Sequence, residues 1–270
     1  MKLGISSYTY SWAVGIPGHL PERPVRPIDL LAKASALGVR VVQIADNMPL
    51  HLLPAAELEV LAEHAQDLGL DIEIGTRGIL PAHLHTYLQL ARQLKSSILR
   101  VVVDTAESHP TRAEIVRTIT SFCLELEQAG VVLAIENHDR FSARTLASII
   151  EQINSDYVGV CLDTVNSFGA LEGPDAVVRT LGPMVANLHI KDFEISRAGH
   201  QMGFIIEGRP AGQGRLNVPW LLETLHGFGQ DPNAILELWT PPAGTLSETV
   251  VREGAWAAES IFYLRQFIQN

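Results

Sequence analysis

The sequence has little cysteine and no long apolar run, and each absence excludes a class of protein. It contains two cysteines, Cys123 and Cys161, and no Cys-x-x-Cys pair, which excludes a disulfide framework and a zinc-ribbon type of metal knot. No stretch approaches the roughly 20 consecutive apolar residues that a membrane-spanning helix needs, and the first residues do not have the design of a signal peptide. We therefore predict a cytoplasmic protein without a membrane partner.

Positive charge is also scarce, which bears on the partners of the protein. There are 20 Lys and Arg residues against 30 Asp and Glu, a formal net charge of −10. Nucleic-acid binding depends on clustered Lys and Arg that neutralise phosphates, so we predict no nucleic-acid partner. Hydrophobic residues make up 47% of the chain, enough apolar surface to offset the entropy lost on folding. No low-complexity tract or linker divides the chain, and we predict a single domain over residues 1–270.

Short apolar runs of strand length recur along the whole chain at intervals of about 27 to 37 residues, with a last interval of about 48. Continuous apolar strands are typical of parallel sheets, which are covered on both faces. The eight predicted strands are Lys2–Ser6, Val39–Ile44, Leu70–Ile74, Ile98–Val103, Val131–Ile135, Val158–Leu162, Val185–Ile190 and Ala234–Leu238.

Helical patterns lie between these runs. Pro54–Leu68 places its leucines and alanines on one face, and Thr111–Ala129 opens with a capping-box spacing and ends before a glycine. Further helix starts are predicted at Ser142, Asn217 and Ser247, and a helix end at Gly38.

Eight strand–helix units in about 270 residues predict an α/β fold of the (β/α)8 TIM-barrel type. A doubly wound open sheet is the rival, but it usually carries a glycine-rich phosphate loop after its first strand. Here the first strand leads into Ser-Ser-Tyr-Thr-Tyr-Ser-Trp, which contains no glycine. The long last interval predicts an extended loop after strand 7, over residues 191–216, on the face where barrel enzymes carry their sites.

Four late strands each end in a potential metal ligand: Glu136, Asp163, His189 and Glu237. The carboxyl ends of barrel strands meet at one rim, so three carboxylates and one imidazole are expected to converge. Burying that much negative charge without a cation is prohibitive. We therefore predict one divalent metal ion at this rim, and the mixed oxygen and nitrogen ligands suit Mn²⁺, Mg²⁺, Co²⁺ or Zn²⁺.

Each ligand also has a structural interpretation. Asp163 can cap the helix that follows it, His189 can be a hydrogen-bonded core residue, and Glu136 can pair with Arg140. Arg100, in the fourth predicted strand, is itself expected to be a buried salt-bridge partner. Four such residues at the ends of consecutive strands favour the metal site over these separate alternatives.

With these residues in view, the chain resembles the xylose isomerase-like TIM-barrel superfamily of sugar isomerases and epimerases, to which DNA-repair endonucleases also belong. The resemblance covers nearly the whole chain and is strongest in Ala-Ile-Glu136-Asn-His, Leu-Asp163-Thr-Val-Asn, Leu-His189-Ile-Lys-Asp and Leu-Glu237-Leu-Trp. It implies that Glu136, Asp163, His189 and Glu237 bind the metal. It also implies that Glu136 and Glu237 are the catalytic groups that move protons.

Four further residues are predicted to contact the substrate. The resemblance implies this role for Arg209, which precedes a Gly-x-Gly turn in the long loop. Lys191 follows His189 closely, and His138 shares a strand face with Glu136 if the strand continues. Asn166 is the fourth, and it stands where many sugar epimerases of the superfamily have a histidine that holds the sugar. This departure puts a ketohexose substrate in doubt and speaks against the multi-zinc cluster of the DNA-repair relatives.

The favoured function is therefore a metal-dependent isomerase or epimerase of a small sugar, keto-sugar or polyol derivative. A metal on a carbonyl oxygen acidifies the neighbouring C–H and stabilises an enediolate, and two carboxylates can exchange the proton. The alternative is a lyase, such as a decarboxylase of a 3-oxo sugar acid, with Lys191, Arg209 or Arg215 holding the substrate carboxylate. A non-enzymatic barrel is the third possibility. A homo-oligomer is compatible with all three.

Overall fold

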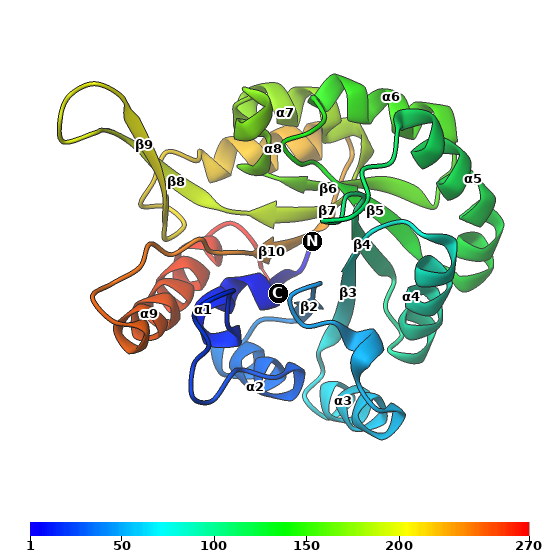
Figure 1. Cartoon of the computed structure of the whole chain (residues 1–270), viewed down its shortest axis with the longest axis horizontal. Coiled ribbons are helices and arrows are strands. Elements are labelled where there is room, and N and C mark those ends of the chain that lie inside the picture. Colours follow the sequence, from blue (N-terminus) through cyan, green and yellow to red (C-terminus); the bar gives the residue numbers. More distant parts are fainter. Residues whose placement is uncertain (270) are drawn as a thin grey trace.

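The computed structural model describes residues 1–269, so the last residue of the predicted domain, 270, lies outside the described residues. Eight parallel strands close into a barrel in the order β1-β10-β7-β6-β5-β4-β3-β2, which confirms the predicted (β/α)8 TIM barrel (Figure 1). The barrel strands are β1 (Leu3–Ser6), β2 (Val41–Ile44), β3 (Asp71–Arg77), β4 (Ile98–Val102), β5 (Val132–Glu136), β6 (Val158–Asp163), β7 (Val185–Ile190) and β10 (Asn233–Leu236). Each overlaps the run predicted for it.

The helices surround the strands as an outer ring (Figure 1). They are α1 (Ser11–Val14), α2 (Pro27–Leu37), α3 (Ala55–Asp67), α4 (Pro81–Gln93), α5 (Arg112–Ala129), α6 (Ala143–Ile153), α7 (Pro174–Leu181), α8 (Val218–Gly227) and α9 (Leu246–Leu264). Short 3-10 turns lie at Ser7–Tyr10, Leu50–Leu52, Asn166–Ala170 and Gly182–Met184. Within residues 1–269 we find no helix with the length and apolarity needed to cross a membrane.

Local sequence signals explain most helix ends. Ser142 and Asn217 cap α6 and α8 as predicted, each accepting a backbone N–H with its side chain. Gly38 ends α2 in the left-handed conformation that glycine adopts without strain. The prediction of a helix start at Ser247 is wrong. Thr245 caps α9 instead, because its hydroxyl accepts the N–H of Glu248 three residues on.

The barrel strands are apolar because both of their faces are covered. Outward side chains pack against the helices, and inward ones fill the barrel. The largest completely buried side chains include Leu3, Ile5, Ile44, Ile74 and Leu99. Burial of this surface at about 25 cal/mol per Å² is the main term that stabilises the fold. It also makes the strand ends a rigid frame for the polar side chains that follow them.

The extended loop predicted after β7, over residues 191–216, contains regular structure. It contains an antiparallel hairpin of β8 (Asp192–Arg197) and β9 (Phe204–Arg209), which projects from the barrel (Figure 1). The carboxylate of Asp192 fixes its base by accepting the backbone N–H groups of Gly212, Gly214 and Leu216 at 2.9 to 3.0 Å. The hairpin therefore starts from a fixed point beside the barrel mouth.

Candidate functional site

The four predicted metal ligands meet at the carboxyl ends of neighbouring strands. Glu136 and Asp163 end β5 and β6, His189 lies near the end of β7, and Glu237 directly follows β10. All four are buried. The Nδ1 atom of His189 lies 3.4 Å from Glu237 Oε1, 3.6 Å from Glu136 Oε2 and 3.8 Å from Asp163 Oδ2. The strand frame therefore brings the predicted set together around one point.

Asp163 divides its two carboxylate oxygens between two tasks. Its Oδ1 accepts the backbone N–H groups of Val165 and Asn166 at 2.8 and 2.9 Å. These contacts close a local turn, but Asp163 does not cap a helix: the 3-10 turn Asn166–Ala170 has Val165 at its N-cap position and no side-chain cap. Its Oδ2 accepts no hydrogen bond from the described chain and faces the cluster. The two turn contacts orient the second oxygen toward the cluster, while its role as a metal ligand stays a prediction.

The tautomer of His189 follows from the amide of Gln43. Gln43 donates its Nε2 to Glu73 at 3.1 Å and to Asn187 at 2.9 Å, which leaves its carbonyl oxygen facing His189. That oxygen lies 2.7 Å from His189 Nε2, so the proton of a neutral imidazole is on Nε2. In that neutral form the lone pair is on Nδ1, which has no hydrogen-bond partner within residues 1–269. Burial alone would lower the pKa of His189, but Cys161, Glu237 and Glu136 raise it above its ordinary value, so without a metal ion the imidazole adds positive charge to the cluster.

One carboxylate oxygen of Glu237 accepts a hydrogen bond, and the other faces Lys191. Ser6, at the end of β1, donates its hydroxyl to Glu237 Oε1 at 2.8 Å. The Nζ atom of Lys191 lies 2.9 Å from Glu237 Oε2 and 2.7 Å from Asp163 Oδ2. These are charge contacts, since neither oxygen accepts a hydrogen bond of good geometry in the described part of the chain.

Glu136 differs from the other carboxylates because both of its oxygens are engaged. Asn166 donates its Nδ2 to Oε1 at 2.6 Å, and Arg100 donates its Nε to Oε2. Arg100 also donates to Asp46 at 2.5 Å. The prediction of a buried salt bridge at Arg100 is confirmed. The alternative prediction, an ion pair between Glu136 and Arg140, is wrong, because Arg140 pairs with Asp104.

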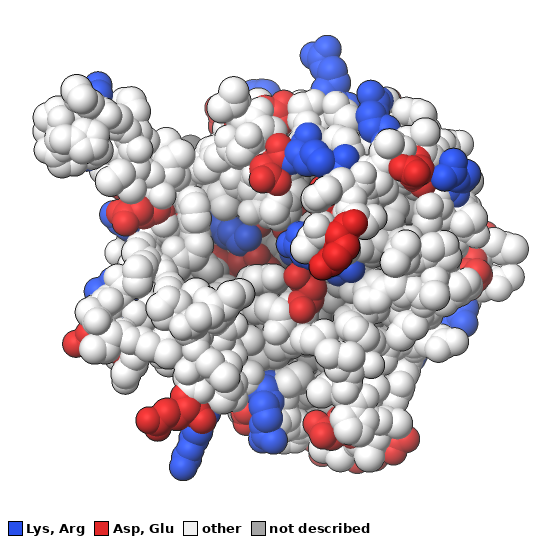
Figure 2. All heavy atoms as spheres, viewed as in Figure 1, with Lys and Arg blue, Asp and Glu red and all other residues white. Residues whose placement is uncertain are grey.

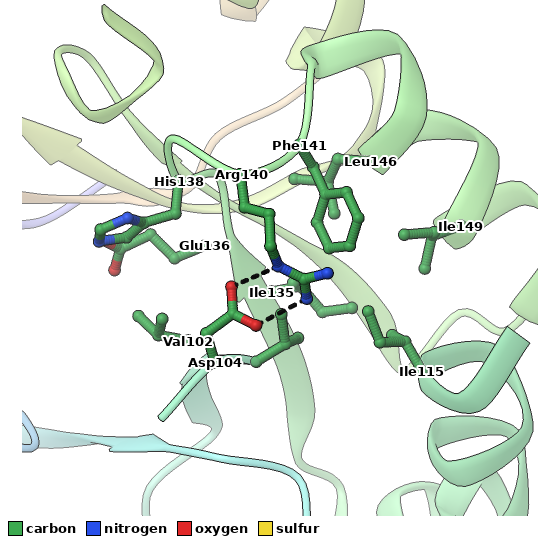
Figure 3. Close-up of a pocket in the computed structure, with 11 residues that line it drawn as sticks. Val102, Asp104, Ile115, Ile135, Glu136, His138, Arg140, Phe141, Leu146 and Ile149 are labelled. Carbon is green, nitrogen blue, oxygen red and sulfur yellow. Dashed lines mark hydrogen bonds and ion pairs between the residues drawn. The ribbon is translucent and has the colours of Figure 1, made fainter. Parts of the chain in front are cut away.

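Figure 3 shows that pair, in which Nε and Nη2 of Arg140 lie 2.7 and 2.6 Å from the two carboxylate oxygens of Asp104. The guanidinium of Arg140 is therefore paired with Asp104 and does not reach Glu136. The cation that neutralises Glu136 comes instead from inside the barrel, from β4.

The charges of the cluster are strongly coupled. Burial alone would raise the pKa of Asp163 and Glu237, but Lys191 and His189 outweigh it and hold both pKa values below their usual range. Burial alone would lower the pKa of Lys191, yet the carboxylates of Asp163 and Glu237 raise it above its ordinary value. Both carboxylates are therefore ionised, and Lys191 carries its charge.

These residues fit a divalent cation. Five buried side-chain atoms of the described chain have no hydrogen bond, and three of them, Asp163 Oδ2, His189 Nδ1 and Glu237 Oε2, belong to this cluster. These three side chains offer ligand atoms within 4.8 Å of one another. Two carboxylate oxygens and an imidazole nitrogen form a donor set that Mg²⁺, Mn²⁺, Co²⁺ or Zn²⁺ accepts. Glu136, Cys161 and His189 form a second group of side chains whose ligand atoms lie close enough to hold a metal ion.

Three of the four predicted substrate residues line the cavities beside the cluster, and the fourth does not. Lys191, His138 and Asn166 line a cavity of about 350 Å³ above the cluster. An adjacent cavity of about 450 Å³ is lined by Lys191 again, with Trp12 and Trp239 among its walls. Figure 2 shows basic and acidic atoms side by side in the hollow of this face. Arg209, at the end of β9, is not among the residues that line these two cavities, and its Nη1 donates to its neighbour's backbone oxygen.

Sequence reasoning missed several residues that position this site. Asp46, Ser6 and Gln43 were not singled out, although each contacts a cluster residue or its ion-pair partner. Gln43 carried a usable signal, since it is a polar residue inside an otherwise apolar buried strand and must find hydrogen-bond partners.

The comparison with protein families agrees with this geometry. A family model described as xylose isomerase-like TIM barrel matches residues 31–267. The chain belongs to this family. It is 33% identical over 264 residues to a 3-oxo-isoapionate decarboxylase of Pectobacterium atrosepticum, covering 98% of this chain and 95% of that protein.

Solved structures show the same fold at low sequence identity. A D-psicose 3-epimerase superposes with a TM-score of 0.75 at 17% identity over 100% of both chains. A xylose isomerase-like TIM-barrel protein from Mycobacterium smegmatis in complex with magnesium superposes with a TM-score of 0.71 at 14% identity, over 96% of both chains. At these identities the solved structures show the shared fold, and the relatives of this chain include an epimerase and a decarboxylase.

Proposed function

We propose that the protein is a divalent-metal-dependent decarboxylase of a 3-oxo sugar acid. The observation that carries the proposal is the engagement of Glu136 by Arg100 and Asn166. An epimerase needs two free carboxylates to remove and return a proton, whereas a decarboxylase needs neither for C–H abstraction. The full-length similarity to a 3-oxo-isoapionate decarboxylase supports the same choice. The order of the two functions predicted from the sequence is thereby reversed.

Asp163, His189 and Glu237 would hold the metal ion, with Glu136 beside them as a fourth ligand or as an outer neighbour. When bound there, a divalent cation supplies Lewis-acid polarisation of the substrate's ketone oxygen. The chain itself supplies the fixed orientation of these donors, through Gln43 on the imidazole and Ser6 on Glu237.

Lys191 is the group we assign to the substrate carboxylate. It is the cation shared by both cavities above the cluster, and an ammonium group can hold a carboxylate by charge and hydrogen bonds. In the reaction the C–C bond to the carboxylate breaks, CO₂ leaves, and the electron pair stays on the carbon next to the ketone. That carbon then takes up one proton.

His138 and Asn166 line the same cavity and are proposed to contact substrate hydroxyls, while Arg209 stays a prediction of the sequence. The apolar walls at Trp12 and Trp239 limit the access of water to the reacting carbon. A carbohydrate acid of one sugar unit suits cavities of this size. A cytoplasmic location and a homo-oligomeric state likewise stay predictions.

The test compares two reactions on one preparation. Purified protein loaded with Mn²⁺ is incubated with 3-oxo-isoapionate, and CO₂ release is followed with a coupled assay. The same protein is incubated in D₂O with D-psicose, and deuterium at C3 is followed by NMR. We expect CO₂ release that chelation abolishes and no deuterium uptake. Deuterium exchange without CO₂ would refute the decarboxylase and restore the epimerase.

A further inference from the structure

The position of Lys191 conflicts with the bound metal ion that the donors imply. Its Nζ lies 2.7 Å from Asp163 Oδ2 and 2.9 Å from Glu237 Oε2. These are two of the oxygens that have no hydrogen bond in the described chain and fit a cation. A divalent ion binds such oxygens at about 2.0 to 2.3 Å, so an ammonium group on the same two oxygens would be in its immediate vicinity.

The charges favour one cation or the other, but not both. Lys191 supplies one positive charge to the two negative charges of Asp163 and Glu237, which leaves one negative charge at this pair of carboxylates. Adding a dication while Lys191 stays in place would reverse the sign and bring like charges together in a buried site, where repulsion is strong. Release of Lys191 from the two oxygens removes that repulsion.

The backbone at Lys191 is fixed while its side chain has room to move. The N–H of Lys191 donates to Thr164 Oγ1 at 2.9 Å, and the hydroxyl of Thr164 donates back to the Lys191 carbonyl at 2.8 Å. The side chain itself is 14% exposed and lines both cavities above the cluster. Rotation about its own bonds is therefore enough to carry the ammonium group into the substrate space.

We propose that Lys191 is an exchangeable counter-ion, which occupies the metal's place in the metal-free protein and turns into the substrate cavity when the metal binds. The cavity then holds a cation for an anionic substrate only in the loaded protein, so metal binding precedes binding of the acid. The exchange of cations rests on the metal-dependent function proposed above, and the order of binding rests in addition on the acid substrate proposed there.

The experiment measures Mn²⁺ affinity by competition with a fluorescent chelator. Lys191→Met removes the competing charge, and Lys191→Arg retains it. Lys2→Met is the matched control, since Lys2 is a half-exposed lysine at the opposite end of the barrel. We expect Lys191→Met to bind Mn²⁺ about tenfold more tightly or better, with Lys191→Arg and Lys2→Met near the wild type.

Two further measurements separate the outcomes. The melting temperature of metal-free Lys191→Met should fall, because two buried carboxylates lose their counter-ion. In a crystal structure with Mn²⁺, Lys191 Nζ should lie beyond hydrogen-bonding distance of both oxygens. Wild-type affinity in Lys191→Met, or an ammonium group that stays on Asp163 in the Mn²⁺ complex, overturns the exchange while the metal function stands. No Mn²⁺ binding by the wild type and by Lys191→Met overturns both.

Discussion

The ion pair between Arg100 and Glu136 gives a quantitative prediction for Arg100→Met. Arg100 is 3% exposed, and the Glu136 side chain is 1% exposed. Methionine keeps the length and the apolar stem of arginine but removes the guanidinium. Asp46 keeps a second partner, because Arg77 Nε lies 3.3 Å from its Oδ2 and Tyr8 donates to the same oxygen at 3.0 Å. The group left with an uncompensated buried charge is therefore Glu136.

Removing one partner of a buried ion pair costs about 3 to 5 kcal/mol, because the other charge stays buried without compensation. For a chain of this length, each kcal/mol lowers the melting temperature by roughly 2 to 4 °C. We therefore expect the metal-free Arg100→Met protein to melt about 10 °C below the wild type. Adding the metal ion should reduce the difference in melting temperature between Arg100→Met and the wild type, because a cation near Glu136 would replace part of the lost positive charge.

The assays are thermal melting and urea unfolding, both with chelator present and both followed by circular dichroism. Arg23→Met, at an exposed position, is the matched control and should change the unfolding free energy by less than about 0.5 kcal/mol. Adding Glu136→Gln to Arg100→Met should recover a large part of the loss, because the stranded charge is removed. A loss below about 1 kcal/mol in Arg100→Met, or no recovery in the double variant, would refute the reasoning.

Three other predictions follow from single contacts. Burial raises the pKa of Glu253 to about 7 from 4.5, so its stabilising contribution is complete below about pH 4.5 and is lost as pH rises to about 7, a change of up to about 3 kcal/mol. Glu253→Gln should flatten this part of the pH profile of urea unfolding, and parallel profiles would contradict the assignment. Gly214→Ala should expose the hairpin to limited proteolysis, because a Cβ there overlaps the Asp192 carboxylate, while Gly199→Ala at the open tip should not. Glu237→Gln should lose Mn²⁺ on gel filtration with an unchanged circular dichroism spectrum; full metal retention would exclude Glu237 as a ligand.

The barrel could be predicted because its signal is local and repeated. A strand such as Val158–Asp163 is buried along its whole length and carries no charge before its last residue, and a glycine or a capping residue marks other helix ends. The hairpin after β7 could not be predicted in the same way. Only β8 alternates polar with apolar residues. β9 begins with the exposed run Phe204, Ile205 and Ile206, so the glycines around it dominate the sequence pattern and the cross-strand pairing is not visible.

The site shows the same division between local and long-range information. The rule that barrel strands end at one rim was enough to bring Glu136, Asp163, His189 and Glu237 together. It gave no information on which cation meets which carboxylate, since Arg100 reaches Glu136 from a neighbouring strand across 36 positions of sequence. Arg140, closer in sequence to Glu136, was the natural candidate and proved to belong to Asp104.

Because the ion-pair partners of the carboxylates come from distant parts of the chain, the reaction has to be inferred from the structure. Carboxylates and an imidazole around a divalent ion serve proton transfer and decarboxylation equally well, so the ligand set alone does not discriminate between them. The discriminating features are the cations beside the set. Arg100 neutralises the glutamate that an epimerase would use as a second base, and Lys191 provides a positive charge that a substrate carboxylate needs. The reaction of a barrel with this ligand set should therefore be inferred from the partners of its carboxylates.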